Sequence, residues 1–281
     1  MVLRIHHLSI FLSLLFWAPL ALSHLEQVRS NRPLYEFGLV GGAGYVPDYP
    51  ASNQGRIRYL VAPVFRYRGF RFRSDEEDSA RARVFLHPLY GVDLNAAGSF
   101  PASSDKNEAR KGMPDLNWMA EIGPRLYVFL FKSEKLWWRV FAPLRLAYST
   151  DLLSATYQGV VFAPSTSVRY FFDDTKFNSM ILGITRTYTG EKFQDYYFEV
   201  DKRFEAPGRP QYSATSGYLS TSAGLAFIHE KNNKGFYAGM GMNSYKGSAN
   251  SGSPLHKSDY TYGAFLGFSY LFYGSEEKGY Q

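Results

Sequence analysis

Apolar and polar residues alternate along most of this chain, and this period of two constrains the fold more than any other feature. In segment 57–67 the odd positions are apolar or aromatic, whereas the even positions begin and end with Arg58 and Arg66. Opposite chemistry on two alternating faces is typical of a half-buried strand. Because arginines stand at both ends of the row of even positions, we expect the row of odd, apolar positions to face lipid. The same alternation recurs in segments 35–45, 70–74, 80–88, 91–100, 116–131, 136–149, 159–172, 178–188, 217–230, 236–246 and 259–273.

The connections between these segments alternate between short and long. Arg68-Gly69 and 132–135 are short turns, whereas 101–115 and 189–216 are long. Outer-membrane barrels have this asymmetry, with short periplasmic turns and longer extracellular loops. The sequence therefore predicts an all-β fold, a transmembrane antiparallel β-barrel of about 12 strands. A barrel of ten strands is the alternative, because the two segments between 70 and 88 are weak.

The first 23 residues have the features of a cleaved export signal. A weakly basic start precedes an apolar run from Leu8 to Leu22, and Ala21-Leu22-Ser23 offers the small residues that a signal peptidase needs. The run is shorter than the roughly 20 residues of a spanning helix. We therefore divide the chain into a signal peptide, 1–23, and an outer-membrane β-barrel, 24–281. The expected location is the outer membrane of a Gram-negative bacterium.

The composition agrees with a barrel and excludes several other classes of protein. Aromatic residues make up 17% of the chain, and barrels use such rings at both membrane interfaces. The chain has no cysteine, which excludes a disulfide framework and a thiolate metal site. The formal charge is +6, but the basic residues are spread over the strands, so we expect no nucleic-acid partner.

No group of residues predicts catalysis, a cofactor or a metal site. The acidic run 75–78 is explained by a solvated turn. His256 and Ser258 are a possible base and nucleophile, but we expect the nearby Asp259 to point to the opposite face. We therefore predict that the protein is not an enzyme. The histidines after residue 23 fall on separate segments at no ligand spacing, and they are His24, His87, His229 and His256.

The predicted inward rows carry an excess of positive charge. An open lumen of this kind would raise the local concentration of anions. In a filled lumen the same arginines would bind carboxylates and backbone carbonyls as a stabilising network. Both alternatives are open, and loop 189–216 is the expected plug. The lumen candidates are Arg58, Arg66, Arg81, Arg83, Arg125, Arg139, Arg145 and Arg169, against Glu36, Asp93 and Glu121.

Several motifs, in their order along the chain, resemble one known family. Segment 44–50 is GYVPDYP, segment 110–118 is RKGMPDLNW, and EIGP follows at 121–124. Together with PQY at 210–212 and SPL at 253–255, they resemble the MltA-interacting protein (MipA)/OmpV family of outer-membrane proteins. The resemblance spans nearly the whole chain after the signal. It implies an outer-membrane barrel without catalytic residues.

The same resemblance implies a role as a scaffold. Such a scaffold would bring a murein-degrading lytic transglycosylase together with a murein-synthesising penicillin-binding protein. Because the periplasmic turns are short, we expect the partner surface at His24–Pro33 and in the tail Glu276–Gln281. A narrow anion-leaning channel is one alternative, and an adhesin that binds through loops 101–115 and 189–216 is another. Outer-membrane lipid and lipopolysaccharide are further expected partners.

Overall fold

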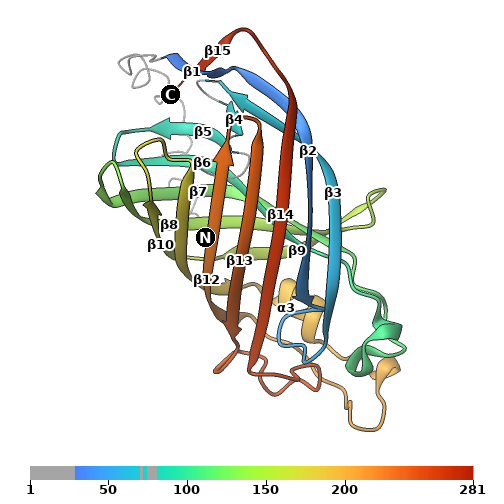
Figure 1. The fold of residues 1–281 in the computed structure, drawn as a ribbon. Coiled ribbons are helices and arrows are strands. Elements are labelled where there is room, and N and C mark those ends of the chain that lie inside the picture. The colour runs from blue at the N-terminus through green and yellow to red at the C-terminus, as the bar shows by residue number, and fades with distance from the viewer. Residues whose placement is uncertain (1–28, 70–71, 75–80, 281) are drawn as a thin grey trace, which may run out of the picture.

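The computed structural model describes residues 29–69, 72–74 and 81–280, and most of them lie in β-strands (Figure 1). The predicted signal peptide and the acidic run 75–78 lie outside the described residues. In the part of the chain that is described, no helix combines the length and the apolar character needed to cross a membrane.

Within the described residues, 13 strands form one large antiparallel sheet. The prediction of an all-β antiparallel fold is therefore confirmed. The strands of this sheet are β2 (Tyr35–Pro47), β3 (Gly55–Arg68), β4 (Phe72–Ser74), β5 (Arg81–Leu86), β6 (Tyr90–Ser99), β7 (Trp118–Lys132), β8 (Leu136–Thr150), β9 (Ala155–Phe162), β10 (Ser165–Phe171), β11 (Asn178–Thr189), β12 (Gly217–Lys231), β13 (Lys234–Ser244) and β14 (Tyr260–Gly274).

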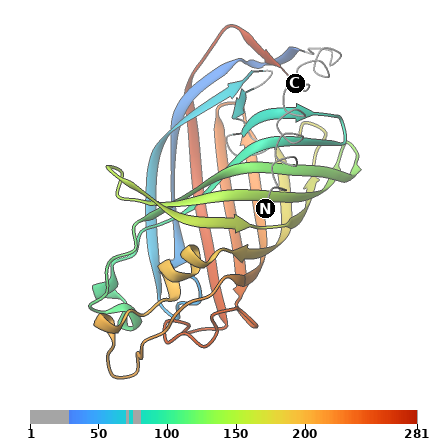
Figure 2. The same cartoon turned by 180° about the vertical axis from the view of Figure 1, so that it is seen from behind.

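The order of the strands follows the chain, with one joint where β14 pairs with β2. At the other joint β8 pairs with both β9 and β10, and β11 pairs with the same two strands. Figure 1 shows β11 to β14 with β2 and β3 as one wall of the molecule. Strands β6 to β9 form a second wall behind it and run at a steep angle to the first. Figure 2 shows the same two walls from the other side.

The two faces of the sheet have the chemistry that the alternation predicts. On β3 the side chain of Val61 is 77% exposed, whereas Arg66 is buried. On β8 Leu144 is exposed and Arg139 is buried. Exposed apolar rows opposite buried charges invert the pattern of a water-soluble sheet and are typical of strands that face lipid. We call the exposed apolar side the outward face and the opposite side the inward face.

The predicted single strand 159–172 is wrong, because the structure has two strands there. β9 ends at Phe162 and β10 begins at Ser165. Pro164 lies in the break, and proline cannot donate a ladder hydrogen bond. The two halves share one position in the sheet, since β8 pairs first with β9 and then with β10.

The long connections pack together at one end of the sheet, around helix α3 (Glu191–Phe198) (Figure 1). Their core includes Tyr49, Phe193, Phe198 and Leu255. Leu116 opens the predicted strand 116–131, but it is buried in this core, because it precedes β7 and bridges to Ala102. We call this assembly the loop core. Its short 3-10 turns are η2 (Ser104–Lys106), η3 (Glu108–Arg110) and η4 (Lys202–Phe204).

The two ends of the described chain meet at the opposite end of the sheet. β1 (Arg29–Pro33) pairs antiparallel with β15 (Lys278–Tyr280). Figure 1 places this pair at the top and α3 near the bottom. We call the pair the terminal sheet.

Candidate functional site

Charged side chains on the inward face form ion pairs between neighbouring strands. Arg125 on β7 binds Asp93 on β6 through two hydrogen bonds, Nε to Oδ1 at 2.9 Å and Nη2 to Oδ2 at 2.8 Å. On β8 the Nε of Arg145 donates to Oε2 of Glu121 at 2.8 Å. Hydrogen bonds between ionised groups are about twice as strong as neutral ones. Four predicted lumen residues are thus brought together as two pairs.

A further pair spans the interior. Nη2 of Arg66 lies 2.7 Å from Oε1 of Glu230, and 3.1 Å from the hydroxyl of Tyr237. β3 and β12 are not neighbours in the sheet, so this contact crosses from one strand group to another. Sequence reasoning missed Glu230. The outward side chains Leu225 and Phe227 were the available signal, because residue 230 has the opposite parity on the same strand.

Glu36 pairs with an arginine that the sequence had placed in a turn. β3 extends to Arg68, whose Nη2 lies 2.6 Å from Oε2 of Glu36. Nη1 of Arg68 also donates to the Pro33 carbonyl at 2.9 Å, and Arg73 donates to the Tyr280 carbonyl at 3.0 Å. Two arginines therefore tie the terminal sheet to the large sheet.

Two other predicted arginines are buried against aromatic rings. The guanidinium of Arg139 lies 5.1 Å from the ring centre of Phe141, and that of Arg169 lies 4.9 Å from the ring centre of Phe171. Nε of Arg169 also donates to Ser179 Oγ at 3.1 Å. Cation–π contacts of this kind gain strength when they are desolvated.

Arg58 shares one carboxylate with a second arginine. Arg56 binds Asp48 through Nε and Nη2, each at 2.7 Å, and Nη2 of Arg58 lies 3.4 Å from the same carboxylate. The Asp48 side chain is fully buried. The two guanidinium groups exceed this carboxylate by one positive charge. The sequence did not nominate Asp48 or Arg56, although Asp48 is the acidic residue of the GYVPDYP segment.

The last two lumen candidates, Arg81 and Arg83, lie on β5, and their side chains are outside the described part of the structure. The backbone register places Arg83 opposite Asp93.

The loop core holds its polar groups tightly. The Tyr49 hydroxyl donates to the Leu255 carbonyl at 2.8 Å, and burial raises the pKa of Tyr49 to about 12. The Arg110 guanidinium lies 5.7 Å from the Tyr49 ring centre, and burial lowers the pKa of Arg110. Burial, followed by the nearby Glu199 and Glu191, raises the pKa of Asp195 to about 6. Among Tyr49, Arg110 and Asp195, Asp195 is therefore the group whose pKa lies nearest to neutral pH.

The possible base and nucleophile at the start of β14 are not joined. Nε2 of His256 lies 3.1 Å from Oδ1 of Asp259, so the expectation that Asp259 points away was wrong. Both residues precede the strand, so strand alternation does not apply to them. Ser258 Oγ donates instead to the Tyr260 carbonyl. Over the described residues, no three His, Cys, Asp or Glu side chains gather as metal ligands would.

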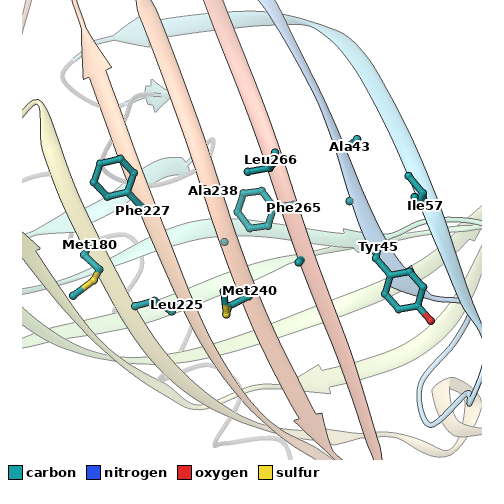
Figure 3. Close-up of a pocket in the computed structure, with 13 residues that line it drawn as sticks. Ala43, Tyr45, Ile57, Met180, Leu225, Phe227, Ala238, Met240, Phe265 and Leu266 are labelled. Carbon is teal, nitrogen blue, oxygen red and sulfur yellow. The ribbon is translucent and has the colours of Figure 1, made fainter.

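A hollow of about 510 Å³ lies on the outward face (Figure 3). Small side chains at Ala43 and Ala238 form its floor, and Met240, Leu225 and Leu266 stand around them. These residues belong to the exposed apolar rows, so the hollow is part of the surface that faces lipid.

Comparison with known proteins identifies one family. The model of the family "MltA-interacting protein MipA" matches residues 39–272. No curated protein matches the sequence.

Three solved outer-membrane proteins are similar at low identity. The NanC porin has 9% identity and a TM-score of 0.39, with 83% of this chain and 98% of that chain covered. The COG4313 outer membrane channel from Pseudomonas putida F1 has 12% identity and a TM-score of 0.45, with 87% and 97% covered. The outer membrane protein OprG from Pseudomonas aeruginosa has 10% identity and a TM-score of 0.24, with 88% and 100% covered.

Proposed function

Since the chain belongs to the MipA family, we propose that it is a non-enzymatic scaffold that holds murein enzymes at the outer membrane. The protein is an outer-membrane β-barrel of a Gram-negative cell. The family name describes an interaction with MltA. Our proposal for this chain is finer: a lytic transglycosylase and a penicillin-binding protein are its partners.

We further propose that the strands close into a ring of twelve positions. The pairing of β14 with β2 supports this closure, as does the pairing of β11 with β9 and β10. β9 and β10 count as one position because they follow each other along β8. An even number puts both chain ends on the same side of the membrane. The pairing of β1 with β15 agrees with that arrangement.

The observation that carries the scaffold proposal is the terminal sheet. Its strands β1 and β15 fall within His24–Pro33 and Glu276–Gln281, the two segments that the sequence nominated as the partner surface. Leu34 N donates to the Glu277 carbonyl at 2.7 Å, which continues the connection between the two ends. The edge of a sheet can serve as a template for main-chain pairing with another chain. The two chain ends therefore form one small sheet beside the short turns, and this sheet is the proposed binding surface for the murein enzymes.

The charge pairs of the inward face support a scaffold over an anion-leaning channel. Arg66, Arg125 and Arg145 each contact a carboxylate within 2.8 Å. Glu230 and Asp48 add two carboxylates to the predicted set, and Arg56 and Arg68 add two arginines, so the formal excess of positive charge is unchanged. An arginine that is held in an ion pair attracts anions less strongly than an unpaired one. The channel is therefore the second candidate, and the adhesin is the third.

The scaffold proposal is tested by co-purification from cells. The full chain is tagged and compared with a variant that lacks residues 278–281. We expect an MltA-type lytic transglycosylase to co-purify with the wild type and to be lost from the variant. A matched control changes Leu152 and Leu153 to serine, at the tip of the β8–β9 hairpin, and should retain the enzyme. Retention by the truncated variant would argue against the terminal sheet as the partner surface.

A further inference from the structure

Strands β4 and β5 lie between β3 and β6, but they fill only part of the wall there. β3 pairs with β2 from Gly55 to Tyr67 but with β4 only at Tyr67 and Arg68. β6 pairs with β7 as far as Ser99 but with β5 only from Gly91 to Leu94. The strands between them are short, since β4 has 3 residues and β5 has 6, against 14 in β3. Among the described residues, positions 55–66 of β3 and 95–99 of β6 thus have a strand neighbour on one side only.

Pro63 agrees with an unpaired edge on β3. The N and O atoms of one residue point to the same side of an antiparallel strand, and this side repeats every second residue. The Phe65 carbonyl accepts from Ser74 Oγ at 3.2 Å, so Phe65 presents its backbone to the side away from β2. Pro63 presents its backbone to the same side, where it has no N–H to donate. Prolines within sheets are confined to such edges.

Side-chain exposure points to an opening at the same place. Leu60 belongs to the inward row with Arg58 and Arg66, yet it is 45% exposed. Residues 96–99 of β6 are exposed at successive positions and therefore on both faces. Because side chains alternate between the faces of a strand, exposure on both faces means that neither side is covered. Over the residues that the structure describes, the wall therefore opens between β3 and β6.

An apolar cavity of about 310 Å³ lies beside this opening. Small-ligand sites span about 300–1,000 Å³, so the cavity is large enough for a slender ligand. A side chain at Gly239 would collide with the ring of Phe265, so glycine there lets this ring lie against the wall as part of the lining. The lining includes Val40, Val46, Leu60, Phe100, Tyr237 and Phe265, with Arg58 as its one charged residue among those described.

The charge at the cavity favours an anion. Arg58 approaches Asp48 with one nitrogen at 3.4 Å, whereas Arg56 binds that carboxylate with two shorter hydrogen bonds. The carboxylate is thus engaged mainly by Arg56, and the guanidinium of Arg58 can take a second anionic partner. Arg56 does not line the cavity.

We propose that this cavity binds a single hydrocarbon chain that ends in an anionic group and enters from the bilayer between β3 and β6. The apolar lining removes the hydrocarbon from water, which is favourable in proportion to the area buried. Arg58 pairs with the anionic end through charge-assisted hydrogen bonds. The lateral opening lets the ligand arrive without passing the loop core. This binding site goes beyond the scaffold function and does not depend on it.

The first test is photo-labelling of the full chain in nanodiscs with a fatty acid that carries a diazirine on its chain. We expect saturable labelling of peptides that contain Leu60 or Phe100. Leu60→Trp fills the cavity and should reduce this labelling about tenfold, a difference of about 1.4 kcal/mol. Leu144→Trp, a matched change on the outward face, should not reduce it. Labelling confined to outward rows, or equal in both variants, would overturn the proposal.

Competition with unlabelled amphiphiles identifies the source of the ligand. Displacement by palmitate alone indicates a free fatty acid, and displacement by lysophosphatidylglycerol as well indicates a lipid phosphate. Either result supports an anionic single-chain ligand. Displacement by hexadecanol as strongly as by palmitate would contradict the assigned role of the anionic end.

The second test uses the two arginines that contact Asp48. Arg58→Gln should lower the affinity for palmitate by about tenfold, as expected for a lost charged hydrogen bond, and leave hexadecanol binding unchanged. Arg56→Lys should leave palmitate binding unchanged, because it keeps a positive charge beside Asp48 and lies outside the lining. Heat-modifiable migration on gels checks that each variant is folded. Equal losses in the two variants, or no loss in Arg58→Gln, would overturn the assignment of Arg58.

Discussion

Asp93 on β6 stands directly opposite Arg125 on β7, and the two side chains share two hydrogen bonds of 2.9 and 2.8 Å. Asp93 is 1% exposed, so the pair is removed from water. Two opposite charges in such a place neutralise each other, and the loss of one leaves the other buried without compensation. Paired charges therefore characterise this part of the inward face.

The Asp93–Arg125 pair predicts a specific pattern of stabilities. Asp93→Ala should lower the free energy of unfolding by about 3–5 kcal/mol, because it leaves the Arg125 charge buried. The double variant Asp93→Leu/Arg125→Met should recover most of this loss, since it buries no charge. Guanidinium unfolding followed by tryptophan fluorescence measures both. An Asp93→Ala variant with the wild-type midpoint would contradict the prediction.

The Arg66–Glu230 contact predicts the ion selectivity of the protein in a planar bilayer. In planar bilayers the wild type should give little or no anion preference, because Arg66, Arg125 and Arg145 are each paired with a carboxylate. Glu230→Gln removes the carboxylate 2.7 Å from Arg66 and should shift any reversal potential toward anion preference. Glu230→Asp keeps the charge and serves as the control. Steady wild-type channels with a strong anion preference would favour the channel over the scaffold.

The raised pKa of Asp195 predicts a pH dependence in the loop core. The folded group titrates near pH 6 and the unfolded one near its ordinary value of 3.8. Between these values the folded state binds more protons than the unfolded chain, so stability rises as the pH falls from about 6 to about 4. The protection factors of the α3 amides, which are corrected for the intrinsic pH dependence of hydrogen exchange, should rise over this range. Asp195→Asn should remove the pH dependence of these protection factors and raise them at neutral pH, and lower protection of wild-type α3 at lower pH would refute the assignment.

The tip of the β8–β9 hairpin predicts a stabilising substitution. Leu152 has a φ of +75°, a left-handed conformation that costs non-glycine residues about 1–2 kcal/mol. Leu152→Asn should raise the stability of the hairpin by part of this cost, because asparagine tolerates the conformation. Leu153→Asn changes the same side chain at a neighbouring position without a positive φ and should have no effect. Hydrogen exchange across Thr150–Ala155 compares the two, and equal effects would argue against backbone strain.

Most of the strands could be predicted from the sequence because lipid imposes its own pattern. A strand that contacts lipid must present one apolar row, and a period of two then becomes visible over its whole length. β7 and β8 start and end within two residues of the predicted segments. The break between β9 and β10 was missed, although Pro164 was a visible signal. β1 and β15 are too short to display an alternation.

The contacts between inward side chains could not be predicted in the same way. Alternation says which face a residue takes but not which distant strand it meets. Arg66 and Glu230 are 164 residues apart and meet because β3 and β12 approach across the interior. Asp48 and His256 lie in loops, where period two carries no information. Arg68 was assigned to a turn because a strand end cannot be located to one residue from sequence alone.

The most direct test of the central proposal measures binding of a purified MltA-type lytic transglycosylase to the full chain in nanodiscs. Biolayer interferometry should give saturable binding to the wild type and little or none to the variant that lacks residues 278–281. Arg68→Ala, which removes the link from β3 to the Pro33 carbonyl and Glu36, should weaken binding in the same direction. The Leu152/Leu153 control should bind as the wild type does. No binding to the wild type, or equal binding to the truncated variant, would contradict a scaffold that works through its terminal sheet.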